Sequence, residues 1–365
     1  MTRRGRNEAS VGMHDHCAAN IGCDAHYLDR LSYDCINVLL EWDNRHHIDL
    51  KWKEIMRDPL EKIGIIQSST IHVLNHFSHD GGAGYDELVP LGQEMGGCCF
   101  LRWHGNCIMR DKKGDTIMRI IRAKDRNEAS YRVANMIYAQ VLLKPDSVLG
   151  LATGSSPTNV YADLIDRHRR GELDFSRVRT VNLDEYIGLG ADHPQSYAWY
   201  MRQHLFDHIQ IDLNNTHIPN GLEADKEKEC ARYDGVIHSL GGVDLQLLGI
   251  GSNGHIGFNE PCGEFVKGTH CVELSETTIA ANARFFERPD MVPKQAYTMG
   301  IMDILQAKRI VMIALGRGKA QAVRNMVCGP VRPEVPASIL QLHPDCILVA
   351  DEEALSLVHP ISEDT

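Results

Sequence analysis

The chain has 365 residues, of which 43% are apolar and 24% charged, values ordinary for a globular protein of one large or two modest domains. Its formal net charge of -11 argues against nucleic-acid binding, because contact with a phosphate backbone needs a basic face. A small anionic ligand is not excluded, since a few local cations and backbone N–H groups suffice to bind it.

The first 117 residues differ in composition from the rest of the chain. They contain three of the four tryptophans and nine of the nineteen histidines, without a regular alternation of strands and helices. We predict one amphipathic helix at Leu28–Trp42 and a strand at Thr70–Leu74. The sequence DKKGD at 111–115 is typical of an exposed turn or linker. Residues 1–117 are therefore interpreted as an N-terminal extension of unassigned structure and order, and residues 118–365 as a separate domain.

From residue 118 onward, apolar runs typical of buried strands alternate with helical patterns. This alternation predicts an α/β fold with an open, mostly parallel sheet and helices on both faces, a Rossmann-like three-layer arrangement. In such sheets ligands bind in the loops beyond the carboxyl ends of the strands. The predicted strands are 118–121, 148–152, 178–183, 243–250, 309–315 and 346–350, and the predicted helices are 127–143, 157–170, 196–208, 224–240 and 319–328.

The first of these loops joins the second predicted strand to a helix and has the sequence ATGSSP. Gly154 permits a tight turn. The N–H groups of the helix start and the hydroxyls of Thr153, Ser155 and Ser156 suit a phosphate group. By itself the loop is explained equally well as an ordinary capped turn. No Gly-Lys-Ser/Thr follows, so it is not a Walker motif and nucleotide binding is disfavoured.

Two adjacent carboxylates, Asp184 and Glu185, follow the third predicted strand. A carboxylate there is well placed to act as a base on a substrate carbon, although either residue alone is more often part of a solvated loop. Adjacent side chains on an extended chain point to opposite sides, so at most one of the two can reach a ligand. We assign that role to Asp184 and expect Glu185 to hold the loop.

The segment GIGSNGHIGFNEP at 249–261 gives the strongest indication of a catalytic site. Its glycines surround His255 and let the backbone approach a ligand closely. A histidine can gain or lose a proton near neutral pH, and Glu260 can orient and tune its ring. A lone histidine is more often structural. In so glycine-rich a setting, with Asn253 and Glu260 nearby, it indicates acid–base chemistry.

Two cations outside these loops, Arg284 and Lys319, are candidate phosphate ligands. Lys319 follows the fifth predicted strand and opens a helix, whose dipole adds to the attraction of an anion. Either cation alone is more often a solvated surface charge. With the loop at 153–156 they predict a phosphate site.

Several segments occur in a characteristic order: LGLATGSSP at 149–157, NLDEYIGL at 182–189, HPQSY at 193–197, GHIGFNEP at 254–261, ANARFF at 281–286 and LQLHP at 340–344. Together they resemble the glucosamine-6-phosphate deaminases of the glucosamine/galactosamine-6-phosphate isomerase family. The resemblance covers Met118 to about Val358 without large gaps. Residues 118–365 are accordingly interpreted as a deaminase catalytic domain.

The resemblance implies a hydrolase of amino-sugar metabolism, acting in N-acetylglucosamine catabolism. It would convert D-glucosamine 6-phosphate and water to D-fructose 6-phosphate and ammonia. The implied steps are ring opening by His255, supported by Glu260 and Asn253, and enolisation with Asp184 as the base. No metal and no organic cofactor is implied. The implied phosphate ligands are Thr153, Gly154, Ser155, Ser156, Arg284 and Lys319.

The sequence departs from the family pattern at two places. Some members have aspartate at the position of Asn253, where an asparagine can orient a neighbour but carries no charge. After Pro261, members activated by N-acetylglucosamine 6-phosphate have serines and basic residues, whereas Gly263, Glu264 and His270 stand here. We therefore expect no such activation.

Two alternative functions remain open at this point. A 6-phosphogluconolactonase shares the general fold and acts on a related phosphate, but Asp184 together with His255 and Glu260 favours the deaminase. A non-catalytic regulator that senses a sugar phosphate would need a DNA-binding helix-turn-helix. The acidic, histidine-rich residues 1–117 offer no convincing one.

The cysteines bear on the compartment and the histidines on metals. Eleven cysteines are an odd number, and several, such as Cys230 and Cys346, lie in regular apolar patterns, so reduced thiols are expected. No apolar run approaches the roughly 18 residues of a membrane span. We expect a cytoplasmic protein with a small-molecule substrate and neither nucleic acid nor membrane as partner; self-association is left open. Because no Cys-x-x-Cys pair accompanies the N-terminal histidines, no metal site is predicted.

Overall fold

The structure, a computed structural model, describes residues 87–90, 99–103, 106–110 and 116–358. The predicted helix at Leu28–Trp42, the strand at Thr70–Leu74 and the turn at 111–115 lie outside these residues. The N-terminal histidines lie outside them as well.

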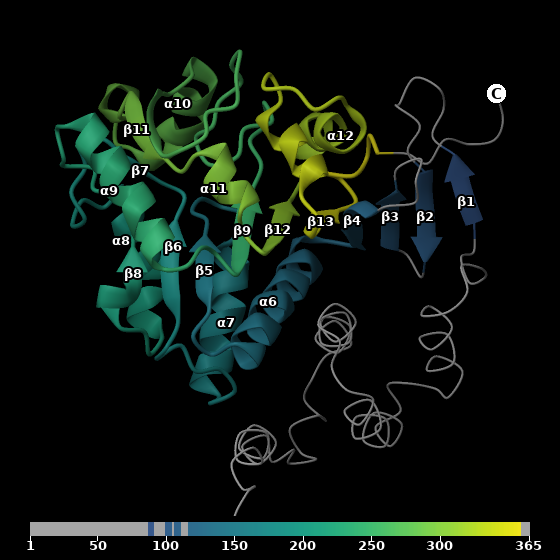
Figure 1. The fold of residues 1–365 in the computed structure, drawn as a ribbon, viewed down its shortest axis with the longest axis horizontal. Coiled ribbons are helices and arrows are strands. Elements are labelled where there is room, and N and C mark those ends of the chain that lie inside the picture. Colours follow the sequence, from purple (N-terminus) through teal and green to yellow (C-terminus); the bar gives the residue numbers. More distant parts are fainter. Residues whose placement is uncertain (1–86, 91–98, 104–105, 111–115, 359–365) are drawn as a thin grey trace, which may run out of the picture. The chain divides into compact units, whose positions relative to one another are not determined.

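Seven parallel strands form the centre of the molecule and confirm the predicted fold class (Figure 1). Each of the six predicted strands is present, with ends shifted by a few residues. The burial of the central strands is complete, as expected for a sheet covered on both faces. In spatial order the strands are β4 (Thr116–Ala123), β13 (Cys346–Asp351), β12 (Arg309–Ala314), β9 (Leu245–Gly249), β5 (Val148–Leu151), β6 (Arg179–Asn182) and β8 (Thr216–His217).

The chain runs along this sheet in two directions. From β4 it proceeds through β5 and β6 to β8 at one edge, and then returns through β9, β12 and β13. Right-handed crossovers therefore place helices of the outward and the return path on opposite faces (Figure 1). The outward helices are α6 (Arg126–Leu143), α7 (Thr158–Arg169) and α8 (Tyr197–His204), and the return helices are α9 (Lys226–Ser239), α11 (Ile301–Leu305) and α12 (Ala320–Cys328).

Three strands that were not predicted from the sequence extend the sheet beyond β4. They are β1 (Glu87–Pro90), β2 (Cys99–Trp103) and β3 (Asn106–Arg110). They form an antiparallel meander, and β3 pairs with β4 with an irregularity at Met109/Arg110. Part of the predicted extension thus continues the sheet of the following domain. The division of the chain between residues 117 and 118 stays a prediction.

A second, three-stranded antiparallel sheet was also not predicted. Its order is β10 (His270–Glu273), β11 (Gln295–Thr298) and β7 (Asp184–Tyr186). Helix α10 (Glu276–Asn282) and the short 3-10 helix η4 (Ala283–Phe285) lie between β10 and β11 in the chain. These strands have the sequences HCVE, QAYT and DEY, which are short and are not continuous apolar runs like those of the central strands. This sheet carries Asp184, as described below.

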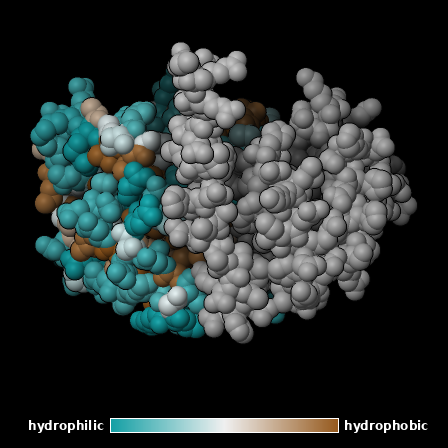
Figure 2. Space-filling view, turned by 60° about the horizontal axis from the view of Figure 1, so that its bottom comes forward, coloured by the Kyte–Doolittle hydropathy of each residue, from teal (hydrophilic) through white to brown (hydrophobic). Residues whose placement is uncertain are grey.

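The outer helices are amphipathic, so the core lies between them and the sheet. In α7 the side chains of Val160, Tyr161, Leu164 and Ile165 are buried, at the spacing of one helix face. Figure 2 shows the described surface on the side of these helices as mostly hydrophilic, with small hydrophobic patches between polar side chains. None of the helices in the described part of the chain has the length and hydropathy needed to span a membrane.

Candidate active site

The loops that follow β5, β6 and β9 meet at one edge of the parallel sheet. β5 and β9 are neighbours, and the chain leaves them toward opposite faces, which opens a crevice at their carboxyl ends. A cavity of about 190 Å³ lies there. Nine of the ten predicted site residues line it, and Glu260 lies behind His255; the nine are Thr153, Gly154, Ser155, Ser156, Asp184, Asn253, His255, Arg284 and Lys319.

The loop at 153–156 is held by hydrogen bonds to its carbonyl oxygens. The hydroxyl of Tyr200 donates to the carbonyl of Gly154 at 2.6 Å, and the hydroxyl of Thr158 donates to the same oxygen at 3.3 Å. Arg126 donates from Nη1 to the carbonyl of Ser155 at 3.0 Å. Gly154 has a φ of 91°, a conformation that favours glycine. The loop is therefore fixed before any ligand arrives.

Asp184 is the first residue of β7 and has a buried side chain. Its carboxylate lies against the loop after β9, since a methyl group added at Gly257 would be 3.4 Å from Oδ2. Burial raises the pKa of Asp184 well above its usual range, and the charge of Glu185 raises it further. A carboxylate with a raised pKa at a cavity wall is suited to accept a proton.

The neighbouring Glu185 does not line the cavity, and its carboxylate binds the start of helix α8, whereas the expectation was that it holds the loop. Its carboxylate accepts hydrogen bonds at 2.9 Å from the backbone N–H groups of Tyr186, Tyr197 and Ala198. Two of these N–H groups belong to the first turn of α8, where a negative charge is favourable. Burial still raises the pKa of Glu185 to about 7 in spite of these bonds.

His255, Asn253 and Glu260 form one polar unit in the loop after β9. The Nδ2 of Asn253 donates to Oε2 of Glu260 at 2.7 Å, and Oδ1 of Asn253 accepts from the backbone N–H of His255 at 3.2 Å. Nδ1 of His255 lies 3.5 Å from Oε1 of Glu260, a long contact for a hydrogen bond. The second ring nitrogen is thereby left for the cavity.

The charge of Glu260 depends on its partners. Burial acts to raise the pKa of Glu260, but the neighbouring His255 ring and the donors Thr278 and Asn253 outweigh burial and lower the pKa to about 2. Glu260 is therefore ionised throughout the neutral range and accepts hydrogen bonds without giving up a proton.

Gly251 provides the space that the His255 ring occupies. A Cβ at position 251 would lie 2.5 Å from ring atoms of His255, closer than non-bonded carbon atoms can approach. The glycines of this segment thus do more than let the backbone approach a ligand, which was their predicted purpose. One of them sets the position of the imidazole.

Two cations line the same cavity as the loop at 153–156. Arg284 lies in η4, and Lys319 ends the 3-10 helix η6 (Arg317–Lys319) that follows β12. Burial lowers the pKa of Lys319, and the positive charge of Arg284 lowers it further. Two cations that repel each other beside a cavity are stabilised by an anion placed between them. This arrangement suits a phosphate group.

A model of the family described as glucosamine-6-phosphate isomerases/6-phosphogluconolactonase matches residues 125–348, more than half of the chain. The chain belongs to this family. A glucosamine-6-phosphate deaminase of Lachnoclostridium phytofermentans is 54% identical over 232 residues, which make up 64% of this chain and 98% of that protein.

Solved structures of the family agree with the observed fold. A monomeric glucosamine-6-phosphate deaminase, 47% identical, matches with a TM-score of 0.64 over 65% of this chain and 99% of its own. A 6-phosphogluconolactonase from Thermotoga maritima, 19% identical, matches with a TM-score of 0.52 over 64% of this chain and 99% of its own. At that identity the second likeness shows the fold alone.

Several residues at or near the site were not predicted from the sequence, among them Thr278, Tyr197 and Asp351. Thr278 and Tyr197 line the cavity, and Asp351 holds the loop that carries Lys319. The backbone N–H of Gly316 donates to both carboxylate oxygens of Asp351, at 2.9 Å each. Asp351 ends β13, so its place after a buried strand was the available signal.

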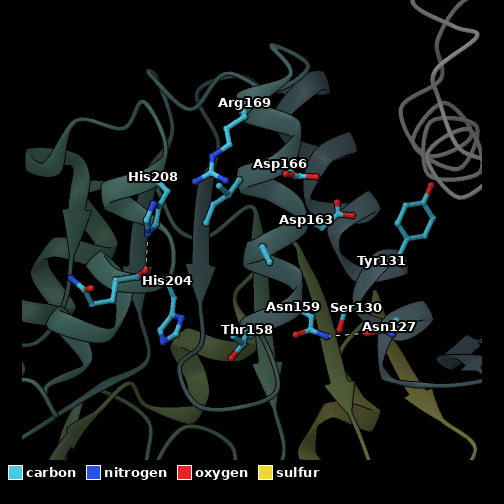
Figure 3. A pocket seen from close by; sticks show the side chains of 13 residues that line it. Asn127, Ser130, Tyr131, Thr158, Asn159, Asp163, Asp166, Arg169, His204 and His208 are labelled. Carbon is cyan, nitrogen blue, oxygen red and sulfur yellow. Dashed lines mark hydrogen bonds between the residues drawn. The ribbon is translucent and has the colours of Figure 1, made fainter.

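A second, larger cavity of about 580 Å³ lies between α6, α7 and α8 (Figure 3). It contains none of the predicted site residues, and its charged side chains are partly compensated within α7. Asp163 pairs with Arg167 at 2.5 Å, and Asp166 pairs with Arg170 at 3.2 Å. In Figure 3 the labelled side chains do not converge on a common point. Size alone therefore does not make it the functional site.

No group of three or more His, Cys, Asp or Glu side chains suited to a metal ion occurs among the residues that the structure describes. The thiols of Cys230, Cys262, Cys271 and Cys346 are free.

Proposed function

We propose that this member of the family is a glucosamine-6-phosphate deaminase. It converts D-glucosamine 6-phosphate and water to D-fructose 6-phosphate and ammonia, and so belongs to amino-sugar metabolism. The observation that carries the proposal is the convergence of Asp184, His255 and two cations on one cavity. It is supported by the 54% identity, over 232 residues, to a protein named as a deaminase. No cofactor is needed, because the reaction consists of proton transfers and the addition and loss of small molecules.

The substrate's phosphate is held at the cationic side of the cavity. The fixed loop at 153–156 offers N–H groups and hydroxyls there, and Arg284 and Lys319 supply positive charge. Binding at this end leaves the sugar carbons to face Asp184 and His255. Charge complementarity explains how a chain of net charge -11 takes an anionic substrate.

Ring opening is the task of His255. Nδ1 of the ring faces the ionised Glu260, which favours a proton on Nδ1 and leaves the other nitrogen to exchange protons with the substrate. The imidazole moves a proton between the C1 hydroxyl and the ring oxygen, so the ring C–O bond breaks and an open-chain aldehyde forms. Glu260 stabilises the positive charge that the ring carries during this transfer.

Enolisation is the task of Asp184. Its carboxylate removes the proton at C2 of the open-chain amino sugar and returns it at C1, while a proton passes from the amino nitrogen to O1. C1=O thereby becomes C1–OH, and the double bond forms between C2 and the nitrogen. Water then adds to C2, and the C2–N bond breaks to release ammonia and leave the ketone at C2. The atoms balance: one water enters and one ammonia departs for each sugar phosphate.

Product release by the purified protein tests the proposal. Ammonia and fructose 6-phosphate should appear in equal amounts from glucosamine 6-phosphate, and Asp184→Asn and His255→Gln should both lower the rate of their release at least about a hundredfold. Hydrolysis of 6-phosphogluconolactone is measured beside them. Lactone hydrolysis without ammonia release would replace the proposed function by a lactonase, and wild-type ammonia release by Asp184→Asn would contradict the assigned base.

A further inference from the structure

Glu260 is fixed from a second segment of the chain, in addition to Asn253. The hydroxyl of Thr278 donates a hydrogen bond to Oε1 of Glu260. Oε1 is also the oxygen that lies 3.5 Å from Nδ1 of His255, whereas Asn253 binds Oε2 at 2.7 Å. The two donors therefore hold the carboxylate at both ends, with one oxygen directed at the histidine.

The direction of the Thr278 bond follows from its neighbours. Thr278 lies in the first turn of α10, where the hydroxyl of Ser275 donates to Thr278 Oγ1 at 3.0 Å. A hydroxyl has one hydrogen to donate, and an ionised carboxylate can only accept. The hydroxyl of Thr278 thus accepts a hydrogen bond from Ser275 and donates its own hydrogen to Glu260. Such a chain of bonds is strengthened in a poorly hydrated site.

Burial makes this contact specific. The Thr278 side chain is 5% exposed and Glu260 is 9% exposed, so water cannot freely replace a lost hydrogen bond. With Asn253 as the remaining donor, the carboxylate would be held at one oxygen and free to turn about its last bond. Nδ1 of His255 would then lose its facing acceptor.

We infer, on the basis of the proposed function, that Thr278 is a positioning residue of the acid–base unit: it orients the Glu260 carboxylate toward His255. Thr278 touches Glu260 and acts on the reaction through it. The same segment carries Arg284 six residues later, so the support of Glu260 and a phosphate ligand lie in one piece of chain between β10 and β11.

Three variants of the full chain test the inference. Thr278→Val keeps the shape of the side chain but removes the hydroxyl, and Thr278→Ser keeps the hydroxyl. Thr269→Val is the matched control, because Thr269 is 7% exposed, its hydroxyl has no hydrogen-bond partner, and it does not line the cavity. We expect kcat of Thr278→Val to fall about ten- to a hundredfold with KM changed less than about threefold. Thr278→Ser and Thr269→Val should stay near the wild-type kcat.

A crystal structure of Thr278→Val separates this inference from the proposed function. We expect the fold to be unchanged and the Glu260 carboxylate to be turned away from His255. A carboxylate in its original place would overturn the inference whatever the activity, and so would a wild-type kcat in Thr278→Val or a kcat in Thr278→Ser as low as in Thr278→Val. If the wild-type protein releases no ammonia, the proposed function fails, while the position of Glu260 still decides the role of Thr278.

Discussion

At the scale of single residues, two carboxylates of the site have surroundings that shift their pKa values in opposite directions. Burial and the charge of Glu185 raise the pKa of Asp184, whereas hydrogen-bond donors lower the pKa of Glu260 to about 2. A proton acceptor needs the first kind of environment, and an orienting charge needs the second. The different tasks proposed for the two side chains follow from this difference.

Asp184 combines a function with a cost in stability. Since its pKa is raised in the folded protein, the folded state binds the proton more tightly than the unfolded chain does. Stability is therefore lost as pH rises from the usual carboxyl pKa through the raised one. We expect Asp184→Asn to lower turnover about 10²- to 10⁴-fold and to raise Tm at pH 7 by about 2–4 °C for each kcal/mol of charge burial removed. Thermal melts and ammonia assays measure both; a variant that melts below the wild type would contradict the account.

The pH profile follows from the same two groups. Activity should decline as pH falls through the raised pKa of Asp184, because the base becomes protonated. Glu260 stays ionised far below that pH, so it does not produce this decline. In Glu260→Gln the rate should drop, but the midpoint of the acid limb of kcat/KM should stay where it is in the wild type. Disappearance of the acid limb in Glu260→Gln would assign the decline to Glu260 instead.

At the scale of elements, strand ends and short helices carry the site. Asp351 lies at the end of β13. Both of its carboxylate oxygens accept from the backbone N–H of Gly316, and Oδ1 also accepts from the backbone N–H of Ala354 at 2.8 Å. It thereby fixes the loop that presents Lys319. Strand β13 thus helps to position Lys319, although none of its own residues is proposed to bind the phosphate.

Removal of this anchor should weaken binding of the phosphate. For Asp351→Ala we expect KM to rise about tenfold, with kcat changed less than about threefold, because the substrate must then order the loop. Glu353→Ala is the control, since Glu353 makes only a 3.3 Å contact with the N–H of Arg317 at an exposed site. Steady-state kinetics with glucosamine 6-phosphate measures both variants. If KM rises equally in Glu353→Ala, the effect comes from a general loosening of this loop and not from the loss of the Asp351 anchor.

At the scale of the whole molecule, experiment can separate the proposed catalytic domain, residues 118–365, from the residues before it. The Lachnoclostridium phytofermentans protein matches over 232 residues, 98% of its length, so a family member exists without a counterpart of about the first third of this chain. Strand β3 nevertheless pairs with β4.

We expect a fragment of residues 118–365 to keep ammonia release within about threefold of the full chain, because the described site residues all follow residue 118. A fragment of residues 85–365 should melt at a higher temperature than 118–365, since the shorter one exposes the edge of β4. Circular dichroism and the coupled assay compare the two. Loss of activity in 118–365 alone would show that β1–β3 belong to the functional unit.

The expected lack of activation by N-acetylglucosamine 6-phosphate also stays a prediction.

Local sequence patterns were enough to predict most of the central sheet, its helices and the place of the candidate site. The six predicted strands stand out as apolar runs, and the five predicted helices show a helical pattern. The polar residues after β5, β6 and β9 indicated the site because strand ends of a parallel sheet share an edge. The assignment of Glu185 to the loop followed from the alternation of side chains on an extended segment.

Tertiary structure decided the rest. The second sheet joins β7 to β11, about 110 residues later in the chain, and none of its strands is a continuous apolar run. Thr278 reaches Glu260 across 18 residues, and Asp351 reaches Gly316 across 35. Such contacts depend on how segments pack, because no local pattern specifies which distant hydroxyl or carboxylate meets a given group. The sequence thus indicated the residues proposed for the chemistry, and the packing decided what holds them in place.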